Sequence, residues 1–272
     1  MLFRSSDTDL TPFDTGAYAS STTFVSGGAV VKAAKSIRNQ IFAVAAQMLG
    51  EELDESLVRA EPKVEWDNTQ PDPILSFYSM EGGNVVSVRS DRKVPVSDVA
   101  YRSYYEVNQR QIATTQSFVS PYSPPPFAAH FAEVEVDELT GKVEVVHYVA
   151  AVDCGVSINP SLVRGQILGA VTNGIGFALT EEYRFGSHGN MINSSLFDYK
   201  ILSRRDMPPV DVIVVDNYEP TGPWGAKSVA EIGINGPLPA IGNAIFDATG
   251  IRLHASPYTP ERVLAALRAK SS

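Results

Sequence analysis

The fold is decided by one stretch of sequence, VEVVHYVAAVDCGVSINPSLVRGQILGAVTNGIGFALTEE, which spans residues 143–182. Its first part, residues 143–151, is rich in β-branched side chains and predicts a strand. A second strand is expected over residues 130–136, because Glu138-Leu139-Thr140-Gly141 indicates a turn between the two. The later part predicts a glycine-rich helix over about 160–182. We therefore expect an α+β fold in which mixed sheets pack against helices.

The rest of the chain contributes further predicted elements. Residues 7–28, rich in Asp, Thr, Ser and Gly, are typical of an ordered loop. The proline-rich stretch 120–127 is either a subdomain boundary within 1–272 or a loop over one continuous core. The remaining predicted elements are an amphipathic helix over 29–49 closed by Gly50, a hairpin within 74–90 around Gly82-Gly83, a helix near 96–109, a strand at 210–215, a loop at 222–236, a helix at about 237–249, and a last helix capped by Thr259 with Pro260 in its first turn.

Composition limits the classes of function. The 272 residues are 44% hydrophobic, which excludes disorder of the whole chain, and their net charge is −9. Binding to nucleic acid or to an anionic membrane surface needs cationic patches, so both partners are disfavoured. No apolar run approaches the ~18–20 residues of a membrane span, and no signal-peptide pattern begins the chain, so we expect a cytoplasmic protein.

Metal ligands are scarce. Cys154 is the only cysteine, so the chain cannot form an internal disulfide or a cysteine-ligated iron–sulfur or zinc site by itself. The four histidines show neither i, i+4 pairing nor an HExxH pattern, which disfavours a zinc site. We interpret Cys154 as a buried small apolar residue.

The glycine-rich helix is the first candidate site. Gly165, Gly169, Gly174 and Gly176 lie within twelve positions, and each costs roughly 1 kcal/mol inside a helix. Either small residues allow close helix packing here, or a large ligand lies against this backbone and Gln166 offers its amide to it.

A hydroxyl cluster is the second candidate. Ser20-Ser21-Thr22-Thr23 follows Ala19 shortly before the predicted helix at 29–49. This cluster is either an ordinary capping loop or a cradle of N–H and hydroxyl groups for phosphate oxygens. It is not a Walker loop, because no GxxxxGK[ST] pattern is present.

The third candidate is Glu231, a single carboxylate within the apolar, glycine-containing stretch 225–236. A buried ionised glutamate costs several kcal/mol unless it is paired, and burial raises a carboxyl pKa toward neutrality. That combination suits a general base. The structural alternatives are a glutamate that caps the next helix or one that pairs with Lys227.

Five motifs occur in a recognisable order: DTDLTPFDTGAYAS at 7–20, DCGVSINP at 153–160 leading into Gly165-Gln166, Ala230-Glu231, NAIFDATGI at 243–251 and TPERVL at 259–264. Together they resemble the C-terminal half of the molybdenum-binding subunit of the xanthine dehydrogenase/aldehyde oxidase family. The resemblance covers nearly the whole chain. It departs from the family pattern at Ala230, where glycine is usual, and at Asn173, where glutamine is usual.

The resemblance implies a role for each candidate. Glu231 matches the family's active-site base, which deprotonates a hydroxide on molybdenum. Gly165 and Gln166 match the segment whose glutamine hydrogen-bonds the pterin. The loop that holds the cofactor's pyrophosphate and pterin is matched by Ala19, Ser20 and Thr22. The implied cofactor is molybdopterin, in its cytosine dinucleotide form, whose dithiolene rather than the protein holds the metal.

The resemblance also implies partners, because nothing in these 272 residues corresponds to the N-terminal half of the family's subunit. We expect a separate chain that carries this half, a 2Fe–2S subunit and a flavin subunit with FAD. The expected reaction of the complex is hydroxylation of a small molecule, at an aldehyde or N-heteroaromatic carbon, with oxygen from water. A non-catalytic scaffold or assembly subunit and an inactive fragment of the same fold are the alternatives.

Overall fold

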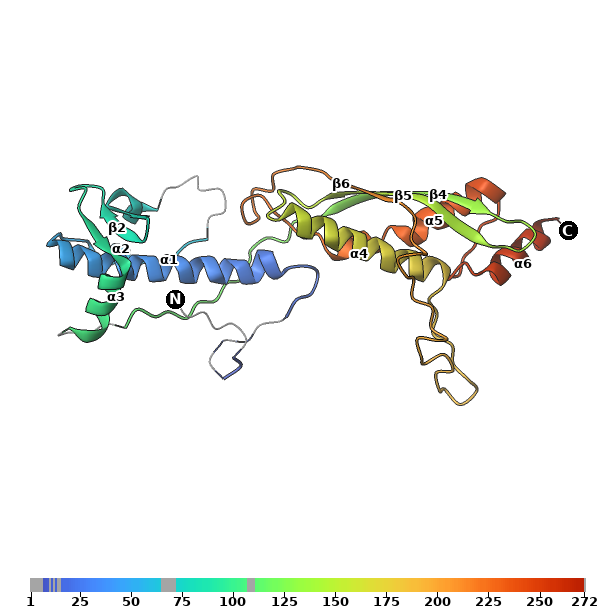
Figure 1. Ribbon diagram of the computed structural model, residues 1–272, viewed down its shortest axis with the longest axis horizontal. Coiled ribbons are helices and arrows are strands. Elements are labelled where there is room, and N and C mark those ends of the chain that lie inside the picture. The colour runs from blue at the N-terminus through green and yellow to red at the C-terminus, as the bar shows by residue number, and fades with distance from the viewer. Residues whose placement is uncertain are drawn as a thin grey trace. The chain divides into compact units, whose positions relative to one another are not determined.

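The computed structural model describes residues 7–9, 11, 13, 16–64, 72–106 and 111–271. The chain divides into two compact units, Met1–Ser123 and Pro124–Ser272, which are drawn in Figure 1 and described separately below. The division lies inside the proline-rich stretch 120–127. Within the described ranges, no helix combines the length and apolar character that crossing a bilayer requires.

Unit 1 packs one long helix against a small antiparallel sheet. Phe42 and Ala45 of the helix, Val85 of the sheet and Val99 of a following helix are fully buried in a common core. The elements of this unit are α1 (Thr22–Leu49), α2 (Glu55–Arg59), η1 (Pro73–Ser76), β1 (Tyr78–Glu81), β2 (Asn84–Ser87), β3 (Lys93–Pro95) and α3 (Val96–Tyr105), with sheet order β1-β2-β3.

The predictions for unit 1 are confirmed in part. The hairpin turns at Gly82-Gly83, both of which have positive φ, and α1 ends at Gly50 as expected. The expected start of this helix at residue 29 is wrong, since α1 begins at Thr22 and takes the end of the predicted loop 7–28 into its first turns. The positions Leu10, Pro12, Asp14 and Thr15 of the first motif lie outside the described residues, as do residues 107–109 of the helix expected near 96–109.

Unit 2 is a mixed sheet covered by helices on one side. Strands β4 (Phe127–Val136) and β5 (Val143–Asp153) pair antiparallel, and β6 (Val210–Val214) pairs parallel to β5 at the other edge. The turn between β4 and β5 forms because Asp137 Oδ1 accepts hydrogen bonds from the N–H groups of Leu139 and Thr140. The remaining elements are α4 (Pro160–Leu179), η2 (Glu231–Ile234), α5 (Pro237–Thr249) and α6 (Pro260–Ser271).

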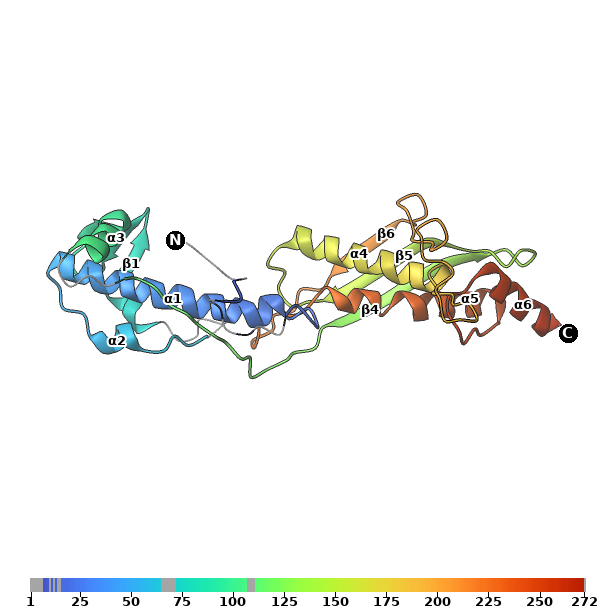
Figure 2. The same ribbon diagram turned by 90° about the horizontal axis from the view of Figure 1, so that it is seen from below.

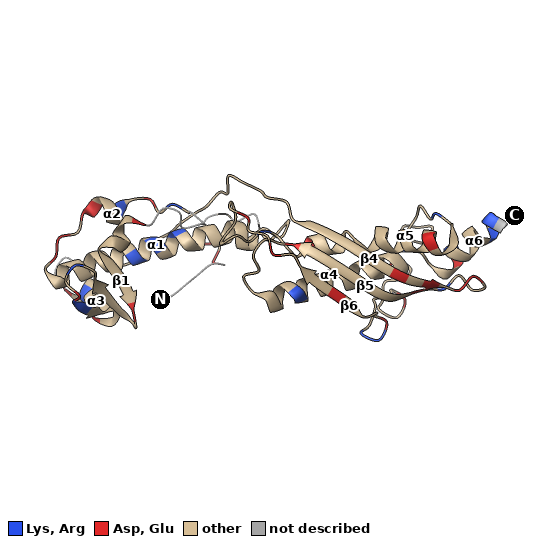
Figure 3. Cartoon of the chain, turned by 90° about the horizontal axis from the view of Figure 1, so that it is seen from above, with Lys and Arg blue, Asp and Glu red and all other residues tan. Residues whose placement is uncertain are grey.

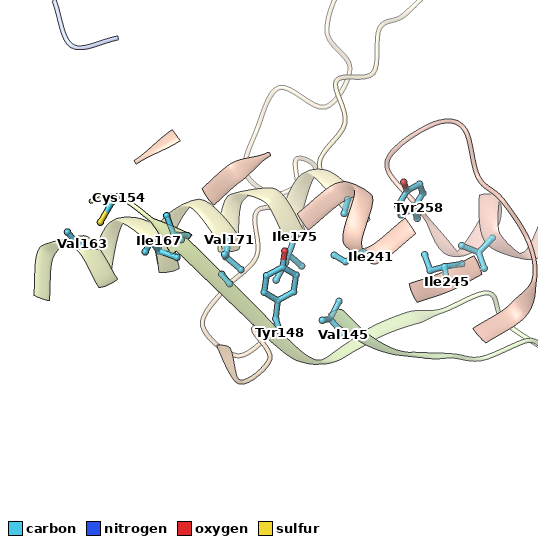
Figure 4. Packing of buried hydrophobic residues seen from close by; sticks show 14 of the residues in the cluster. Val145, Tyr148, Cys154, Val163, Ile167, Val171, Ile175, Ile241, Ile245 and Tyr258 are labelled. Atoms are coloured by element: carbon cyan, nitrogen blue, oxygen red, sulfur yellow. The ribbon is translucent and has the colours of Figure 1, made fainter. Parts of the chain in front are cut away.

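The core of unit 2 lies between the sheet and the two helices α4 and α5. Figure 2 shows both helices in front of the strands, and Figure 4 shows the side chains between them. Tyr148 of β5 and Ile167 and Ile175 of α4 are at most 1% exposed, as are Ile241 and Ile245 of α5. Cys154 is also buried, as expected. The expected α+β class, with a mixed sheet packed against helices, is confirmed.

Candidate functional site

The helix α4 has one buried face and one exposed stripe. Its N-terminus is capped by Asn159, whose Oδ1 accepts a hydrogen bond from Leu162 N at 3.1 Å, and Pro160 occupies the first turn. Apolar residues at i, i+4 spacing face the sheet, so the opposite side of the helix faces away from the core of unit 2. The residues of this stripe are Leu162, Gly165, Gln166, Gly169, Asn173 and Phe177, all of them exposed.

The four glycines of α4 separate into two kinds. A Cβ at Gly174 would lie 2.5 Å from Pro237 Cγ and one at Gly176 would lie 2.1 Å from Glu181 Oε1, so these two glycines allow close packing around the end of α4. A Cβ at Gly165 or Gly169, in contrast, would meet no described heavy atom within 4 Å. Helical glycine still costs about 1 kcal/mol at each of these two positions, and packing of the described residues does not explain that cost.

Glu231 lies on a short 3-10 turn that packs against α4. A Cβ at Gly233 would lie 2.9 Å from Ala170 Cβ and 3.7 Å from Ile167 Cα, so η2 contacts the turn of α4 that directly follows Gln166. The structure therefore brings the segments of Glu231 and Gln166 together. The side chain of Glu231 is exposed, so the burial expected from its apolar sequence surroundings is wrong for this chain by itself.

Both structural alternatives for Glu231 can be compared with the structure. Lys227 Nζ lies 2.9 Å from Asp153 Oδ2, in a pair whose side chains are 4% and 13% exposed. Gly236 occupies the N-cap position of α5, and among the described residues no side chain caps that helix.

The Asp153–Lys227 pair holds the loop that carries Glu231. Lys227 N donates to Cys154 O at 2.9 Å, and Asp153 also accepts from Asn217 Nδ2 at 3.1 Å and from the Gly155 N–H at 2.9 Å. Gly155 has φ +68°, and a Cβ there would collide with the Gly225 carbonyl oxygen. The motif that begins at Asp153 thus joins the end of β5 to the loop before η2.

The charge state of Asp153 follows from its partners. Burial by itself raises the pKa of its carboxyl group, but hydrogen bonds from Lys227, the Gly155 N–H and Asn217 outweigh burial and hold the pKa below its ordinary value. Asp153 therefore stays ionised at neutral pH and keeps its bond to Lys227. This pair was not predicted from the sequence. Its signal there is that Asp153 follows one apolar stretch and Lys227 lies within another.

The N-terminus of α1, in unit 1, carries the second group of candidate residues. Ala19 and Ser20 have positive φ, +49° and +54°, and Ser21 follows in the right-handed region at φ −87°. The Ser21 N–H and the Ser21 hydroxyl both donate to Tyr18 O, at 3.0 Å and 2.8 Å, and close the turn that precedes the helix. Among the described residues, no side chain caps the 28-residue helix that begins at Thr22, so the first turn points its N–H groups outward.

The structure distributes the predicted site residues over both units. Ala19, Ser20 and Thr22 belong to unit 1, whereas Gly165, Gln166 and Glu231 belong to unit 2. In the second unit the structure brings the Gln166 and Glu231 segments into contact through η2 and α4. Within the ranges that are described, no three His, Cys, Asp or Glu side chains form a group able to hold a metal ion.

Comparisons with known proteins identify relatives along the whole chain. A family model for a molybdopterin cofactor-binding domain matches residues 2–208. A probable hypoxanthine oxidase of Escherichia coli strain K12 is 35% identical over 264 residues, which make up 97% of this chain and 25% of that protein. The gamma subunit of the 6-hydroxypseudooxynicotine dehydrogenase complex of Paenarthrobacter nicotinovorans is 31% identical, over 96% of this chain and 31% of that subunit.

A solved structure shares the fold. Quinoline 2-oxidoreductase from Pseudomonas putida 86 superimposes with a TM-score of 0.72 at 23% identity, over 96% of this chain and 32% of that one. The expected cofactor-binding fold is thereby confirmed. The chain spans about a quarter to a third of the length of these relatives.

Proposed function

Because the chain belongs to the molybdopterin cofactor-binding domain family, in its xanthine dehydrogenase branch, we propose that it supplies a base and part of the cofactor cradle of a molybdenum hydroxylase. The observation that carries this proposal is the exposed stripe of α4, with two glycines that meet no described atom and with Glu231 on a turn packed beside it. The proposed reaction joins an aldehyde or N-heteroaromatic C–H group and water to form a C–OH group, and it releases two electrons and two protons.

The stripe of α4 fits a large, flat, polar heterocycle. Gly165 and Gly169 leave the backbone open to close approach, and the Gln166 amide offers one acceptor oxygen and two N–H donors. In the proposed complex these three residues hold the pterin. When bound, the molybdenum–pterin cofactor supplies the two-electron oxidation that the side chains of this chain cannot perform.

The N-terminus of α1 fits the phosphate end of such a cofactor. Anions bind at helix N-termini because unpaired N–H groups point at them and the helix dipole favours negative charge. The segment Ala19-Ser20 and the first turn at Thr22 bring backbone N–H groups and the Thr22 hydroxyl to this end of the helix. We assign them to the pyrophosphate of the cytosine dinucleotide form of the cofactor.

Glu231 is the proposed base. An ionised carboxylate accepts protons and cannot donate them, so one of its oxygens takes the proton from the water-derived hydroxyl group that attacks the substrate carbon. The loop before Glu231 is held by the buried Asp153–Lys227 pair, and η2, which begins at Glu231, contacts α4 through Gly233. Orientation of this kind is what a general base needs from its scaffold.

The described residues supply only part of the proposed enzyme. Its relatives are three to four times as long, and one is named as a subunit of a dehydrogenase complex. We assign the rest of the molybdenum-binding subunit to a further polypeptide, and electron transfer to partners with a 2Fe–2S cluster and FAD. One buried cysteine cannot hold such a cluster, which is why we place it on a partner.

The cradle can be tested with Gln166→Ala in the purified complex. Loss of one amide that hydrogen-bonds the pterin is expected to lower cofactor retention about three- to tenfold. Molybdenum and released pterin are measured per mole of complex after extended dialysis. The matched control is Ser161→Ala, an exposed residue of the same helix that lies off the stripe. Equal retention in both variants would remove Gln166 from the cradle.

Gly169→Ala separates cofactor contact from helix stability. Because a Cβ meets no described atom there, alanine is expected to raise the free energy of unfolding of the chain by about 0.5–1 kcal/mol. The same variant is expected to take up less molybdenum, because the methyl group occupies space that the pterin needs. Urea denaturation and metal analysis measure the two effects. A more stable variant with full molybdenum content would argue against a ligand at this helix face.

A further inference from the structure

His130 is the one titratable side chain that β4 turns toward the core of unit 2. Side chains alternate between the two faces of a strand, and Val134, in the same row as His130, packs against the core. Glu133 and Glu135 belong to the other row and face away from the helices. β4 packs against α5 and also contacts η2, the turn that begins at Glu231. The proposed mechanism gives this histidine no part.

The imidazole ring of His130 is tied to β5 by one hydrogen bond. Its Nδ1 lies 2.9 Å from the hydroxyl oxygen of Tyr148, whose fully buried side chain points from the strand toward the helices (Figure 4). Burial raises the pKa of the Tyr148 hydroxyl, so this group keeps its proton and donates a hydrogen bond to Nδ1. The neutral ring then carries its hydrogen on Nε2. That nitrogen is buried, and among the described residues it has no hydrogen-bond partner. Such a nitrogen is rare in folded proteins and requires a reason.

The other contact of the ring is with the backbone of Gly236. A Cβ at this position would lie 2.0 Å from His130 Cδ2 and 2.1 Å from His130 Cγ. Gly236 has φ −81° and ψ −37°, a conformation that residues with side chains adopt without strain. The imidazole ring, rather than the backbone conformation, therefore requires glycine here.

Gly236 connects the segment of Glu231 to a helix. It follows η2 after one residue, Asn235, and it is the N-cap residue of α5. We call residues 231–237 the η2–α5 junction. Because the His130 ring lies between β4 and this junction, it sets how closely the end of η2 and the start of α5 approach the sheet.

The His130 ring is neutral in the folded chain at pH 7. Burial lowers its pKa, and the positive end of the α5 dipole, at Gly236, also disfavours a charged ring. Figure 3 marks the charged residues of the surrounding elements. The titratable groups that the covered face and its helices carry are Tyr148 of β5, Glu231 of η2, Asp247 of α5 and Arg164 of α4. Of these, Tyr148 is hydrogen-bonded to the ring.

We propose that neutral His130, held by Tyr148, positions the η2–α5 junction and thereby Glu231, and that proton uptake by His130 loosens the junction; this inference rests on the proposed role of Glu231. A proton that passes from water to Nδ1 removes the acceptor of the Tyr148 hydroxyl. It leaves a charged ring whose Nε2–H has no partner among the described residues. A buried charge is costly, so the ring moves toward water and Gly236 loses its contact. His130 is a positioning residue, because it acts through the junction and not on the reacting atoms.

The pH dependence follows from the direction of the pKa. The folded-state pKa of His130 lies below its ordinary value, so the contribution of the neutral ring to stability is complete above that ordinary value. This contribution is lost as the pH falls from there through the folded-state pKa, since the unfolded chain binds the proton first. The junction is therefore expected to open in weak acid.

Hydrogen exchange of the junction tests the proposal without a measurement of activity. The full-length chain is exchanged at about pH 7.5 and at about pH 5.5, on either side of the ordinary histidine pKa. Rates are corrected for the intrinsic effect of pH, and the peptide over residues 231–242 is followed by mass spectrometry. In the wild type, the corrected exchange is expected to be about three- to tenfold faster at the lower pH.

Two variants assign this acid effect to one histidine. His130→Gln keeps an amide for Tyr148 and takes up no proton, so equal protection is expected at both pH values. The matched control is His147→Gln, whose histidine pairs with Asp211 on the uncovered side of the same sheet, and it is expected to keep the wild-type dependence. A wild type without the acid effect, or His130→Gln with it, overturns the proposal.

Gly236→Ala tests the contact from the other side. Its Cβ displaces the His130 ring, so exchange of the junction at about pH 7.5 is expected to rise about threefold or more. In a chain that already has His130→Ala, the same substitution is expected to add nothing, because no ring is left to displace. Additive effects in the two backgrounds would contradict the contact.

Turnover separates this inference from the proposed function. In the assembled complex, Gly236→Ala is expected to lower kcat about tenfold while KM and molybdenum content stay near wild type, since the carboxylate of Glu231 is present but misplaced. Faster exchange of the junction with unchanged kcat would reject the proposed role of Glu231 alone. Unchanged exchange, together with an inactive Glu231→Gln complex, would reject the inference about His130 alone.

Discussion

Glu231→Gln is expected to lower the turnover of the assembled complex by about 10²–10⁴-fold while leaving its molybdenum content near that of the wild type. Glutamine keeps the size and the acceptor oxygen of glutamate but cannot take up a proton at neutral pH. The substitution therefore removes the base and leaves the cradle of α4 in place. Turnover is measured with an aldehyde and with an N-heteroaromatic substrate and an artificial electron acceptor, and metal content is measured on the same preparation.

The control for this experiment is Glu138→Gln, which removes an equivalent exposed carboxylate from the β4–β5 turn. Its turnover is expected to match the wild type. If Glu231→Gln were equally active, the base would have to be elsewhere, and the scaffold interpretation of the chain would be favoured. If both turnover and molybdenum content fell together, Glu231 would act in cofactor binding rather than in proton transfer.

Asp153→Ala is expected to lower the free energy of unfolding of unit 2 by about 3–5 kcal/mol at pH 7. The substitution leaves Lys227, whose side chain is 4% exposed, as an uncompensated buried charge, and it also removes the acceptor for Asn217 and Gly155. Urea denaturation of the full-length chain, followed by circular dichroism, measures the change. A loss below about 1 kcal/mol would show that the pair does not hold this loop.

Two controls distinguish the buried pair from an ordinary surface ion pair. Glu144→Ala breaks the Lys142–Glu144 pair, whose side chains are 65% and 63% exposed, and is expected to cost less than about 1 kcal/mol. Asp153→Ala combined with Lys227→Met removes both buried charges and is expected to recover most of the stability lost in the single variant.

The stability difference between the wild type and Asp153→Ala also depends on pH. The pKa of Asp153 is lower in the folded chain than the ordinary value of an aspartate carboxyl group, so the ionised carboxylate stabilises the fold at every pH above that ordinary value. As the pH falls through the folded-state pKa, the carboxyl group takes up a proton and this contribution is lost. The two proteins are therefore expected to approach equal stability in strong acid.

The local elements of unit 2 could be predicted from the sequence. The helix expected at 237–249 matches α5, and the strands around Glu138-Leu139-Thr140-Gly141 match β4 and β5 in order and direction. Both predictions rest on periodicity and turn chemistry, which act between residues close in sequence. The start of α1 was placed too late because Ser20-Ser21-Thr22-Thr23 indicates a cap without showing which of its residues begins the helix.

The candidate site needed long-range information. Lys227 precedes Glu231 by one helical turn of sequence and was considered as its partner, yet it pairs with Asp153, 74 positions away. The exposure of Glu231 could not be predicted either, because an apolar local sequence does not tell which segments cover a side chain. Gly165, Gly169 and Gly174 look alike in sequence, and their difference depends on whether α5 packs against them.

By itself, the sequence determined the order of strands and helices, the family of the chain and the residues worth testing, because these depend on local patterns and on motifs in a fixed order. Only the tertiary structure decided which charges pair, which glycines face outward and which side of the β4-β5-β6 sheet stays open. The physical reason is the same in each case. Burial and pairing are set by contacts between segments far apart in the chain, and those contacts exist only once the chain has folded.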